Sequence, residues 1–329
     1  MSWLERSPIQ GIINQLKPLP YPETDCSGKT IIVTGANVGL GLEAARHFVR
    51  LNAAKVILGC RNVEKGSQAK TDIETSTNRT GVAEVWQLDL TSFDSVKEFC
   101  QRAEKLHRLD VVVENAGVAT GDFVQYEGYE QQITVNVIST FLMALLILPS
   151  LRRTATRFNV VPSLVIVTSD AHAYTSLTRA RNAPSIFEAL RGSAGMSGRY
   201  SNSKLLEVLV VRELATEMES SPKKPRVALN LVHPGLCKSK LFRHITWPIS
   251  WIIAIGFLLL ARTSEMGSRT LVSAALAGEE THGKYLGDCR MMEPSRFVRS
   301  EEGKRVQKRA YDELLGILEG VEPGITKNI

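Results

Sequence analysis

The stretch "TIIVTGANVGLG" at residues 30–41 decides the fold. A β-rich run ends there in glycines at positions 35, 39 and 41, directly before a helical pattern at 40–53. Glycines at such a turn let the backbone approach a pyrophosphate at a helix N-terminus, where free N–H groups and the helix dipole favour anions. The spacing is T-G-x-x-x-G-x-G rather than G-x-G-x-x-G. A structural turn that binds no ligand is the alternative interpretation.

The same strand-then-helix pattern repeats along the chain. Further β-rich runs lie at 55–60, 82–89, 109–117, 163–170, 226–235 and 284–293, and helical patterns include 92–107 and 129–151. Such alternation implies right-handed crossovers, a parallel seven-stranded sheet and helices on both faces. We therefore expect an α/β fold with a single doubly wound Rossmann domain, whose ligands bind beyond the carboxyl ends of the strands.

Composition excludes several classes of protein. The chain has 329 residues, of which 43% are hydrophobic and 22% charged, so it can bury a large core. The net charge of +6 is spread along the sequence, and no run of basic residues exceeds two, so no nucleic-acid partner is expected. Five cysteines lie far apart without a C-x-x-C motif, which indicates neither disulfides nor a metal site. A reducing, cytoplasmic location is the simplest expectation.

Two segments stand apart from this alternation. Residues 1–27 lack the continuous apolar core of a signal peptide and are interpreted as an N-terminal extension, ahead of a single domain at 28–329. The stretch "ITWPISWIIAIGFLLLA" at 245–261 contains no charged residue. It is shorter than the ~20 residues of a typical membrane span, and a proline and a glycine interrupt it. We expect it to belong to an apolar substrate lid at about 236–263.

The sequence "SGRYSNSKLL" at 197–206 places Tyr200 and Lys204 four residues apart, on one face of a predicted helix. A neighbouring ammonium favours the phenolate and lowers a tyrosine pKa from about 10 towards neutrality. Tyr200 could then serve as a general acid or base. A surface tyrosine beside a solvated lysine is the alternative.

Seven short motifs favour the catalytic interpretation. "TGANVGLG" (34–41), "LDL" (88–90), "ENAG" (114–117), Asn136 in "TVNVIST", Ser169 in "VIVTSDAH", "YSNSK" (200–204) and "HPG" (233–235) occur in one order along the chain. This order resembles the short-chain dehydrogenase/reductase family over residues 28 to 320. Within that family the chain is similar to retinol-dehydrogenase-like and fungal biosynthetic members.

The resemblance implies a catalytic set of Ser169, Tyr200, Lys204 and Asn136. Ser169 would hydrogen-bond the substrate oxygen and stabilise a developing alkoxide. The matching asparagine of the family holds a water that relays protons to the lysine, whereas a helix-packing asparagine is the alternative for Asn136. The residues expected to bind the cofactor are Gly35, Asn37, Val38, Gly39, Leu40, Gly41, Arg61, Asp89, Leu90, Asn115, Ala116, Gly117, Tyr200, Lys204, Pro234 and Gly235.

Arg61 decides the expected cofactor. An acid at the end of the second strand commonly binds the ribose 2′-OH of NAD, whereas an arginine accommodates the 2′-phosphate of NADP. Here the strand ends in "GCRN", with no carboxylate before Glu64, so NADP(H) is favoured. Glu114 departs from the family's common N-N-A-G, which leaves the contact at that strand end open. A solvated loop charge is the alternative for Arg61.

The expected activity is hydride transfer between NADP(H) and a carbonyl or secondary alcohol, as in a biosynthetic ketoreductase. Trp247, Trp251 and Phe257 in the lid favour a bulky apolar substrate of polyketide, terpenoid, steroid or retinoid type. His172 could contact the substrate or be structural. The outer side of the lid would rest on a membrane surface or on a second subunit of a homodimer. A non-catalytic NADP(H)-binding protein and a membrane-associated scaffold are the alternative functions.

Overall fold

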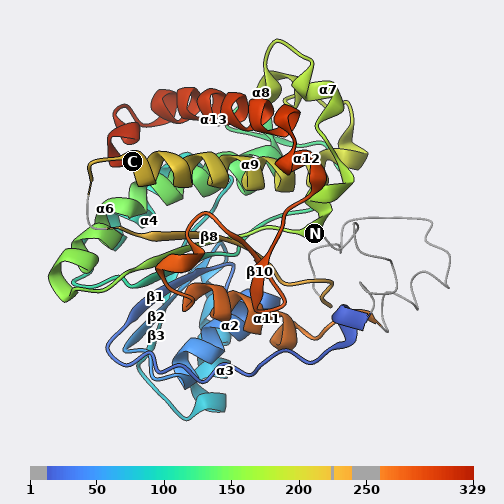
Figure 1. The fold of residues 1–329 in the computed structure, drawn as a ribbon. Helices are drawn as coiled ribbons and strands as arrows, with labels where there is room; N and C mark the ends of the chain where they lie inside the picture. The colour runs from blue at the N-terminus through green and yellow to red at the C-terminus, as the bar shows by residue number, and fades with distance from the viewer. Residues whose placement is uncertain (1–12, 224–225, 239–259) are drawn as a thin grey trace.

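A twisted sheet runs through the middle of the molecule (Figure 1). The computed structural model describes residues 13–223, 226–238 and 260–329. The sheet has eight strands in the order β3-β2-β1-β4-β7-β8-β9-β10. These are β1 (Thr30–Thr34), β2 (Lys55–Cys60), β3 (Ala83–Gln87), β4 (Val111–Glu114), β7 (Ser163–Val167), β8 (Ala228–His233), β9 (Tyr285–Gly287) and β10 (Arg290–Met292).

The strand order reverses between β1 and β4. From β1 the chain adds β2 and β3 on one side, and then β4, β7 and β8 on the other, with every one of these pairs parallel. Such a reversal leaves a crevice outside the carboxyl ends of the strands. The α/β fold with a mostly parallel sheet is therefore confirmed.

The expected last strand at 284–293 is wrong as a single element. It folds into β9, which is parallel to β8, and β10, which is antiparallel to β9. The turn between them uses Asp288 and Cys289, with φ of 50° and 57°. Two consecutive residues with positive φ reverse the chain sharply, as in a two-residue hairpin turn. The sheet therefore has eight strands rather than seven, and its last strand runs antiparallel.

Helices cover both faces of the sheet (Figure 1). One face carries α2 (Gly39–Arg50), α3 (Val63–Thr77) and α11 (Ser264–Ala275), and the other carries α4 (Phe93–Glu104), α6 (Thr140–Phe158), α9 (Arg199–Ser220) and α13 (Glu301–Val321). Alternate side chains of a strand enter opposite layers. Ile31 and Val33 of β1 pack with α2 and α11, whereas Ile32 packs with the other layer. The period-two pattern thus builds two apolar cores.

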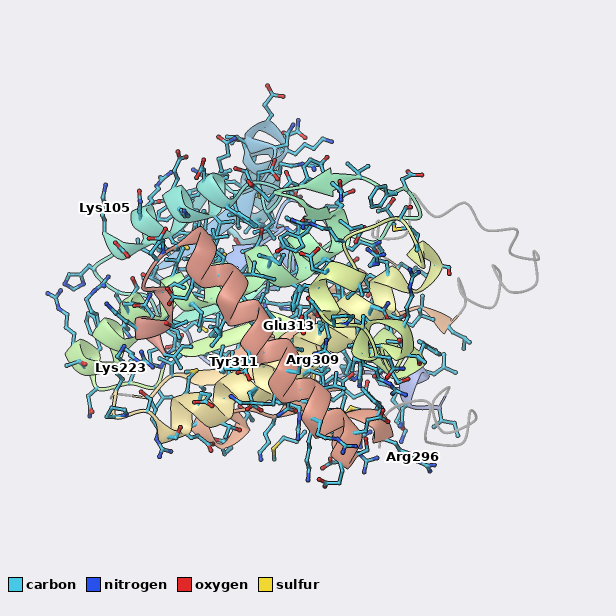
Figure 2. The ribbon with its side chains drawn as sticks, turned by 90° about the horizontal axis from the view of Figure 1, so that it is seen from above. Lys105, Lys223, Arg296, Arg309, Tyr311 and Glu313 are labelled. Atoms are coloured by element: carbon cyan, nitrogen blue, oxygen red, sulfur yellow. The ribbon has the colours of Figure 1, made fainter. Side chains whose placement is uncertain are left out.

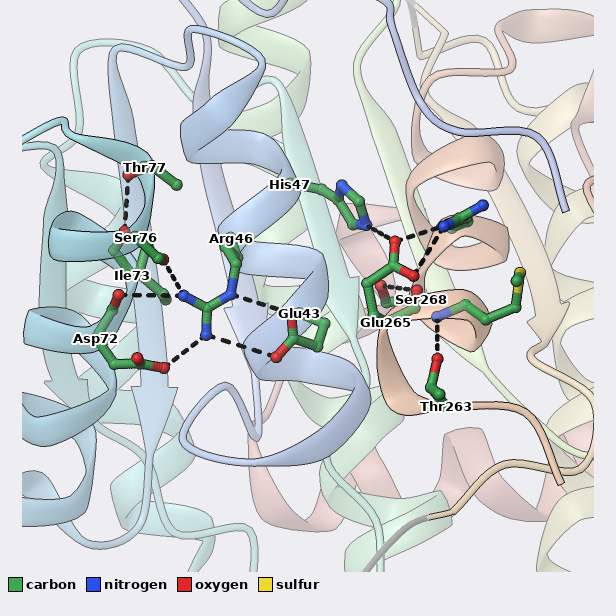
Figure 3. A network of polar contacts seen from close by, with 12 residues as sticks. Glu43, Arg46, His47, Asp72, Ile73, Ser76, Thr77, Thr263, Glu265 and Ser268 are labelled. Atoms are coloured by element: carbon green, nitrogen blue, oxygen red, sulfur yellow. Dashed lines mark hydrogen bonds and ion pairs between the residues drawn. The ribbon is translucent and has the colours of Figure 1, made fainter. Parts of the chain in front are cut away.

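Polar contacts join the helices of the first layer at their outer edges (Figure 3). Arg46 of α2 donates to Asp72 Oδ2 of α3 at 2.6 Å. On the other side of α2, the buried His47 lies 3.1 Å from Glu265 Oε1 of α11. Because α2 begins at the glycine turn, these contacts fix the helix whose N-terminus faces the crevice.

The remaining elements of the described residues are short. They are β5 (Gln125–Tyr126), β6 (Tyr129–Glu130), α5 (Gln131–Ile133), the π-helix η2 (Thr134–Ser139), η3 (Asp170–Tyr174), α7 (Thr178–Arg181), α8 (Ile186–Ala189), η4 (Met196–Gly198), η6 (Glu279–Thr281), α12 (Arg296–Arg299) and η7 (Ile325–Asn328). Figure 2 shows α13 crossing the layer above α9, with Arg309 and Glu313 near its middle. Glu313 Oε2 accepts hydrogen bonds from the backbone N–H groups of Ile186 and Phe187, so α13 holds the α7–α8 segment in place.

One helical stretch of the described residues, Gln131–Phe158, is long and apolar enough to cross a membrane. It is 89% buried within the fold over its most apolar window, as expected for a core helix. The segment interpreted as a lid is largely outside the described residues, since only 236–238 and 260–263 of it are described. Trp247, Trp251 and Phe257 lie in the part that is not described.

Candidate active site

The glycine turn after β1 has the geometry of an anion-binding loop. Gly35 and Gly39 have φ of +65° and +63°, which side chains other than glycine rarely adopt. A Cβ on Gly41 would lie 2.6 Å from the carbonyl oxygen of Gly35, so only glycine fits there. Helix α2 begins at Gly39, and Val38 before it has no polar side chain that could cap the helix. Its first N–H groups therefore face the crevice as donors, beside Asn37 and Leu40.

The "NAG" segment after β4 is attached to the end of β1. The Asn115 side chain donates to the carbonyl oxygen of Thr34 at 2.9 Å. The backbone N–H groups of Asn115 and Ala116 both donate to Thr34 Oγ1, each at 2.9 Å. A Cβ on Gly117 would lie 3.8 Å from Lys204 Nζ. This segment therefore lies between the glycine turn, to which it is hydrogen-bonded, and the predicted catalytic lysine.

Three of the residues expected to bind the cofactor, Arg61, Asp89 and Leu90, follow β2 and β3. Arg61 directly follows β2 and is exposed. The Asp89 carboxylate accepts hydrogen bonds from the N–H and Oγ1 of Thr91, at 2.9 and 2.7 Å. The carbonyl oxygen of buried Leu90 accepts from Ser139 Oγ of the π-helix at 2.7 Å. Asp89 and Leu90 thus hold the loop in shape, and their contacts to a cofactor stay predictions.

The segment after β8 is fixed by the N-terminal extension. Gly235, which follows the buried Pro234, has φ of +76°, and a Cβ there would lie 2.9 Å from Gln15 Oε1. The Gln15 amide donates to the carbonyl oxygens of Leu236 at 2.6 Å and Leu260 at 3.1 Å. Its oxygen accepts from the N–H of Leu236 at 3.2 Å. The extension therefore contacts both ends of the segment predicted to form the lid.

Ser169, Tyr200 and Lys204 come together where β7 ends and α9 begins. The Tyr200 hydroxyl hydrogen-bonds the Ser169 side chain, and Lys204 Nζ lies 5.8 Å from the centre of the Tyr200 ring. Burial raises the pKa of Tyr200 above its usual value, while Lys204 and the Ser169 hydrogen bond act against that rise. The net direction is opposite to the sequence expectation, although Lys204 acts in the expected sense. Tyr200 is therefore protonated at neutral pH.

Asn136 lies in the π-helix and is fully buried. Its side-chain oxygen accepts from the N–H of Val118 at 2.8 Å. Its amide donates to the carbonyl oxygen of Val118 at 2.9 Å and to Ser203 Oγ at 3.0 Å. These bonds join the segment after Gly117 to α9, beside Lys204. The structure thus shows a packing role for the Asn136 side chain, and the water relay stays a prediction.

Comparisons with known proteins agree with this geometry. Residues 29–176 match the family described as short chain dehydrogenase. The short chain dehydrogenase/reductase dmxR8 of Cryptosporiopsis sp. is 45% identical over 320 residues, which cover 95% of this chain and 97% of the relative. The short chain dehydrogenase atnD of Emericella nidulans is 46% identical over 84% of this chain and 88% of its own length. The chain belongs to the short-chain dehydrogenase/reductase family. It is therefore an NAD(P)-dependent oxidoreductase.

Solved structures show the same fold. A protein from Mycobacterium paratuberculosis superposes with a TM-score of 0.62 at 24% identity, over 89% of this chain and 95% of that chain. A short chain dehydrogenase of Shigella flexneri complexed with NADP has a TM-score of 0.56 at 23% identity. That alignment covers 82% of this chain and all of the Shigella chain.

Glu207 contacts the predicted catalytic lysine, and the sequence analysis missed it. Lys204 Nζ donates to Glu207 Oε1 at 2.7 Å and to the carbonyl oxygen of Val167 at 3.0 Å. Burial alone would lower the pKa of Lys204, but Glu207 and Tyr200 outweigh it and raise the pKa above its usual value. The available signal was a carboxylate three residues after the lysine, within the apolar run "LLEVLVV".

Of the two interpretations of His172, a substrate contact or a structural role, the contacts of its ring favour the structural one. The ring is fully buried, and its Nε2 accepts from the backbone N–H of Ser295 at 3.1 Å. Nδ1 must then carry the proton, and it donates to the carbonyl oxygen of Ser169 at 2.9 Å. His172 thereby fixes the backbone of Ser169, the predicted catalytic serine.

Arg199, which directly precedes the catalytic tyrosine, is a second residue that was missed. Its side chain is completely buried and forms an ion pair with Glu130 at 3.4 Å. The guanidinium also donates to the carbonyl oxygens of Leu190, Gly192 and Ala194. It therefore anchors the loop before α9, one wall of the expected substrate pocket. No sequence pattern singled it out, because Glu130 lies far away in the sequence and its other partners are backbone atoms.

Proposed function

We propose that the protein is an NADP(H)-dependent reductase that interconverts a carbonyl and a secondary alcohol of a bulky apolar substrate. The observation that carries this proposal is the contact between Ser169 and Tyr200, with Lys204 directly behind them. All three lie beyond the carboxyl end of β7, at the crevice where this fold binds its ligands.

The residues present fit a nicotinamide dinucleotide. The turn formed by Gly35, Gly39 and Gly41 presents backbone donors where a pyrophosphate would bind. Arg61, exposed directly after β2, supports NADP(H) over NAD(H), because a guanidinium pairs with a 2′-phosphate. The NADP bound to the Shigella relative is consistent with this choice at the level of the fold.

The chain's own groups supply the proton chemistry. A bound nicotinamide cofactor would supply or accept the hydride. In reduction, Tyr200 donates its proton to the substrate oxygen, and Ser169 donates a hydrogen bond to the same oxygen as negative charge develops. The Lys204 ammonium stabilises the phenolate that Tyr200 leaves behind. In oxidation, the same groups act in the reverse order.

The substrate class is supported by apolar side chains. Tyr174 ends the η3 helix that follows Ser169, and 62% of its surface is exposed. The expected lid adds three more aromatic side chains, those of Trp247, Trp251 and Phe257. A bulky apolar ketone of polyketide, terpenoid, steroid or retinoid type would match these surfaces. Contact with a membrane, dimer formation and a cytoplasmic location stay predictions.

NADPH oxidation with a panel of apolar ketones, and with sugars of similar size as controls, tests the proposal. We expect turnover with several bulky ketones and none with the sugars. Cofactor binding without any turnover across the panel would instead favour the non-catalytic alternative. Recovery of the protein only in membranes washed with high salt and carbonate would favour the scaffold.

A further inference from the structure

Two buried carboxyl groups lie behind the catalytic lysine. Glu207 is one turn further along α9, and its side chain is 2% exposed where it meets Lys204. Glu114 ends β4 and is also buried. Among the residues that the structure describes, neither oxygen of Glu114 has a hydrogen-bond partner. Carboxyl groups therefore lie on the side of the Lys204 amine that faces the core, where apolar side chains are usual.

The buried ion pair between Lys204 and Glu207 is not expected to stabilise the fold. The neighbours of Glu207 along α9, Leu206 and Val208, are fully buried. Burying an ion pair costs desolvation energy that its attraction often fails to offset, and an apolar replacement is often as stable. The 2.7 Å contact instead uses one of the three ammonium protons, and Val167 uses a second. One proton of Lys204 is left for the side of Tyr200 and the cofactor.

The titratable groups around Glu207 come from three elements. Lys204 and Tyr200 share its helix, Glu114 faces it from β4, and the buried Cys100 of α4 faces Glu114. Burial raises the pKa of Glu207 to about 7, although Lys204 holds it down. Burial and Glu207 raise the pKa of Glu114 well above its usual range. Above neutral pH, Glu207 is thus the negative group beside Lys204, whereas the raised pKa of Glu114 favours its neutral form.

We propose that Glu207 is a positioning residue of the active site, whose carboxylate orients the Lys204 ammonium and offsets part of its charge at Tyr200. This inference rests on the proposed function and deepens it. With less positive charge behind it, Tyr200 keeps its proton to higher pH and serves as a proton donor. The site is thereby biased towards carbonyl reduction.

The substitution Glu207→Gln removes the charge while keeping the shape. Ultraviolet titration of the phenolate, as the difference between each protein and its Tyr200→Phe counterpart, reports the ionisation of Tyr200 without any turnover. We expect the Tyr200 titration to move about one pH unit lower, since a nearby charge shifts a pKa by that order. The alkaline limb of the ketone reduction profile should move by the same amount. Glu219→Gln makes the same chemical change at an exposed position of α9 and should move neither.

An unchanged Tyr200 titration in folded Glu207→Gln overturns the proposal, even if its rate falls, because a structural role alone lowers rates without moving a titration. If that variant does not fold, Glu207→Asp takes its place and should shift the titration in the same direction by less. No shift in the aspartate variant likewise overturns the proposal. Failure of the proposed function would appear separately, as a wild type that titrates at Tyr200 but reduces no ketone.

Discussion

We expect cofactor preference to depend on Arg61, which is exposed directly after β2. Arg61→Asp replaces a group that pairs with a 2′-phosphate by one that repels it and can accept from a 2′-OH. Because a charge-assisted hydrogen bond contributes about 1.5–3 kcal/mol, the ratio of kcat/KM for NADPH over NADH should fall roughly ten- to a hundredfold. Steady-state rates with both cofactors measure this. Arg305→Asp, at an exposed position of α13, should leave the ratio unchanged. A wild type that already prefers NADH would contradict the role of Arg61.

At this scale the sequence could predict residues whose spacing carries a chemical meaning. Ser169, Tyr200 and Lys204 fall in one order and register, and the structure brings them together. Glu207 and Arg199 could not be found in that way. Their importance depends on burial and on which groups they contact, and a single sequence records neither property.

Among the elements, the N-terminal extension departs most from expectation. It was predicted to lie ahead of the fold, yet Arg262 donates to the carbonyl oxygens of Asn14 and Gln15, at 2.7 and 3.1 Å. Gln15 in turn bonds the backbone after Gly235. Composition gave no sign of this, because a short polar segment with few apolar residues looks alike whether it is docked or free.

The substitution Gln15→Ala should loosen the segment that follows β8. It removes three hydrogen bonds of a side chain that is 6% exposed, each contributing about 1 kcal/mol, so the free energy of unfolding should fall by roughly 3 kcal/mol. Affinity for NADPH should fall several-fold, because Pro234 and Gly235 are expected to contact the cofactor. Thermal unfolding and cofactor titration measure the two effects. Gln101→Ala, at an exposed position of α4, is the matched control. An unchanged NADPH affinity would separate the extension from the site.

The hairpin at the sheet edge shows another limit of sequence reasoning. The run 284–293 has strand-forming residues on both sides of Asp288 and Cys289. Asp-Cys is not among the residue pairs, such as Asn-Gly, that mark a two-residue turn, so the reversal left no recognisable signal. By contrast, the strands β1 to β8 in the main sheet are separated by helical patterns that predict parallel pairing.

For the whole molecule, buried ionisable groups make stability depend on pH in two opposite directions. Burial lowers the pKa of His47 from 6.5 to about 4, against the effect of Glu265. The unfolded chain then binds more protons between those values, so stability falls as pH drops from about 6.5 to 4. The pKa of Glu114 is raised from 4.5, so the folded chain holds its proton longer and stability falls as pH rises above about 4.5.

Glu114→Gln isolates the second effect. The variant has no carboxyl group at position 114, so it does not lose stability as that group ionises. The difference in melting temperature, variant minus wild type, should therefore increase steadily from pH 5 to pH 8. A difference of the order of 1–3 kcal/mol at pH 8, or roughly 2–8 °C, is expected because each pKa unit corresponds to about 1.4 kcal/mol. Thermal melts at several pH values measure it. A difference that is constant across the range would mean that Glu114 is ionised in the folded protein.

The overall fold was predictable because period-two strands and period-3.6 helices alternate, which is typical of a parallel sheet covered by helices. The identity of the substrate was not, because the pocket depends on how distant segments meet. Arg309 of α13, for example, donates to the carbonyl oxygens of Arg181 and Ala183, in the segment that we expect to form a wall of the pocket.

The most direct test of the central claim is Tyr200→Phe, which removes the proton donor and leaves the ring. We predict that kcat for ketone reduction falls by about 10² or more, the usual contribution of a general acid, while the dissociation constant for NADPH changes by less than about twofold. Single-turnover reduction with a working ketone and fluorescence titration of NADPH give the two numbers. A variant that keeps more than about a tenth of the wild-type rate would contradict a general-acid role for Tyr200.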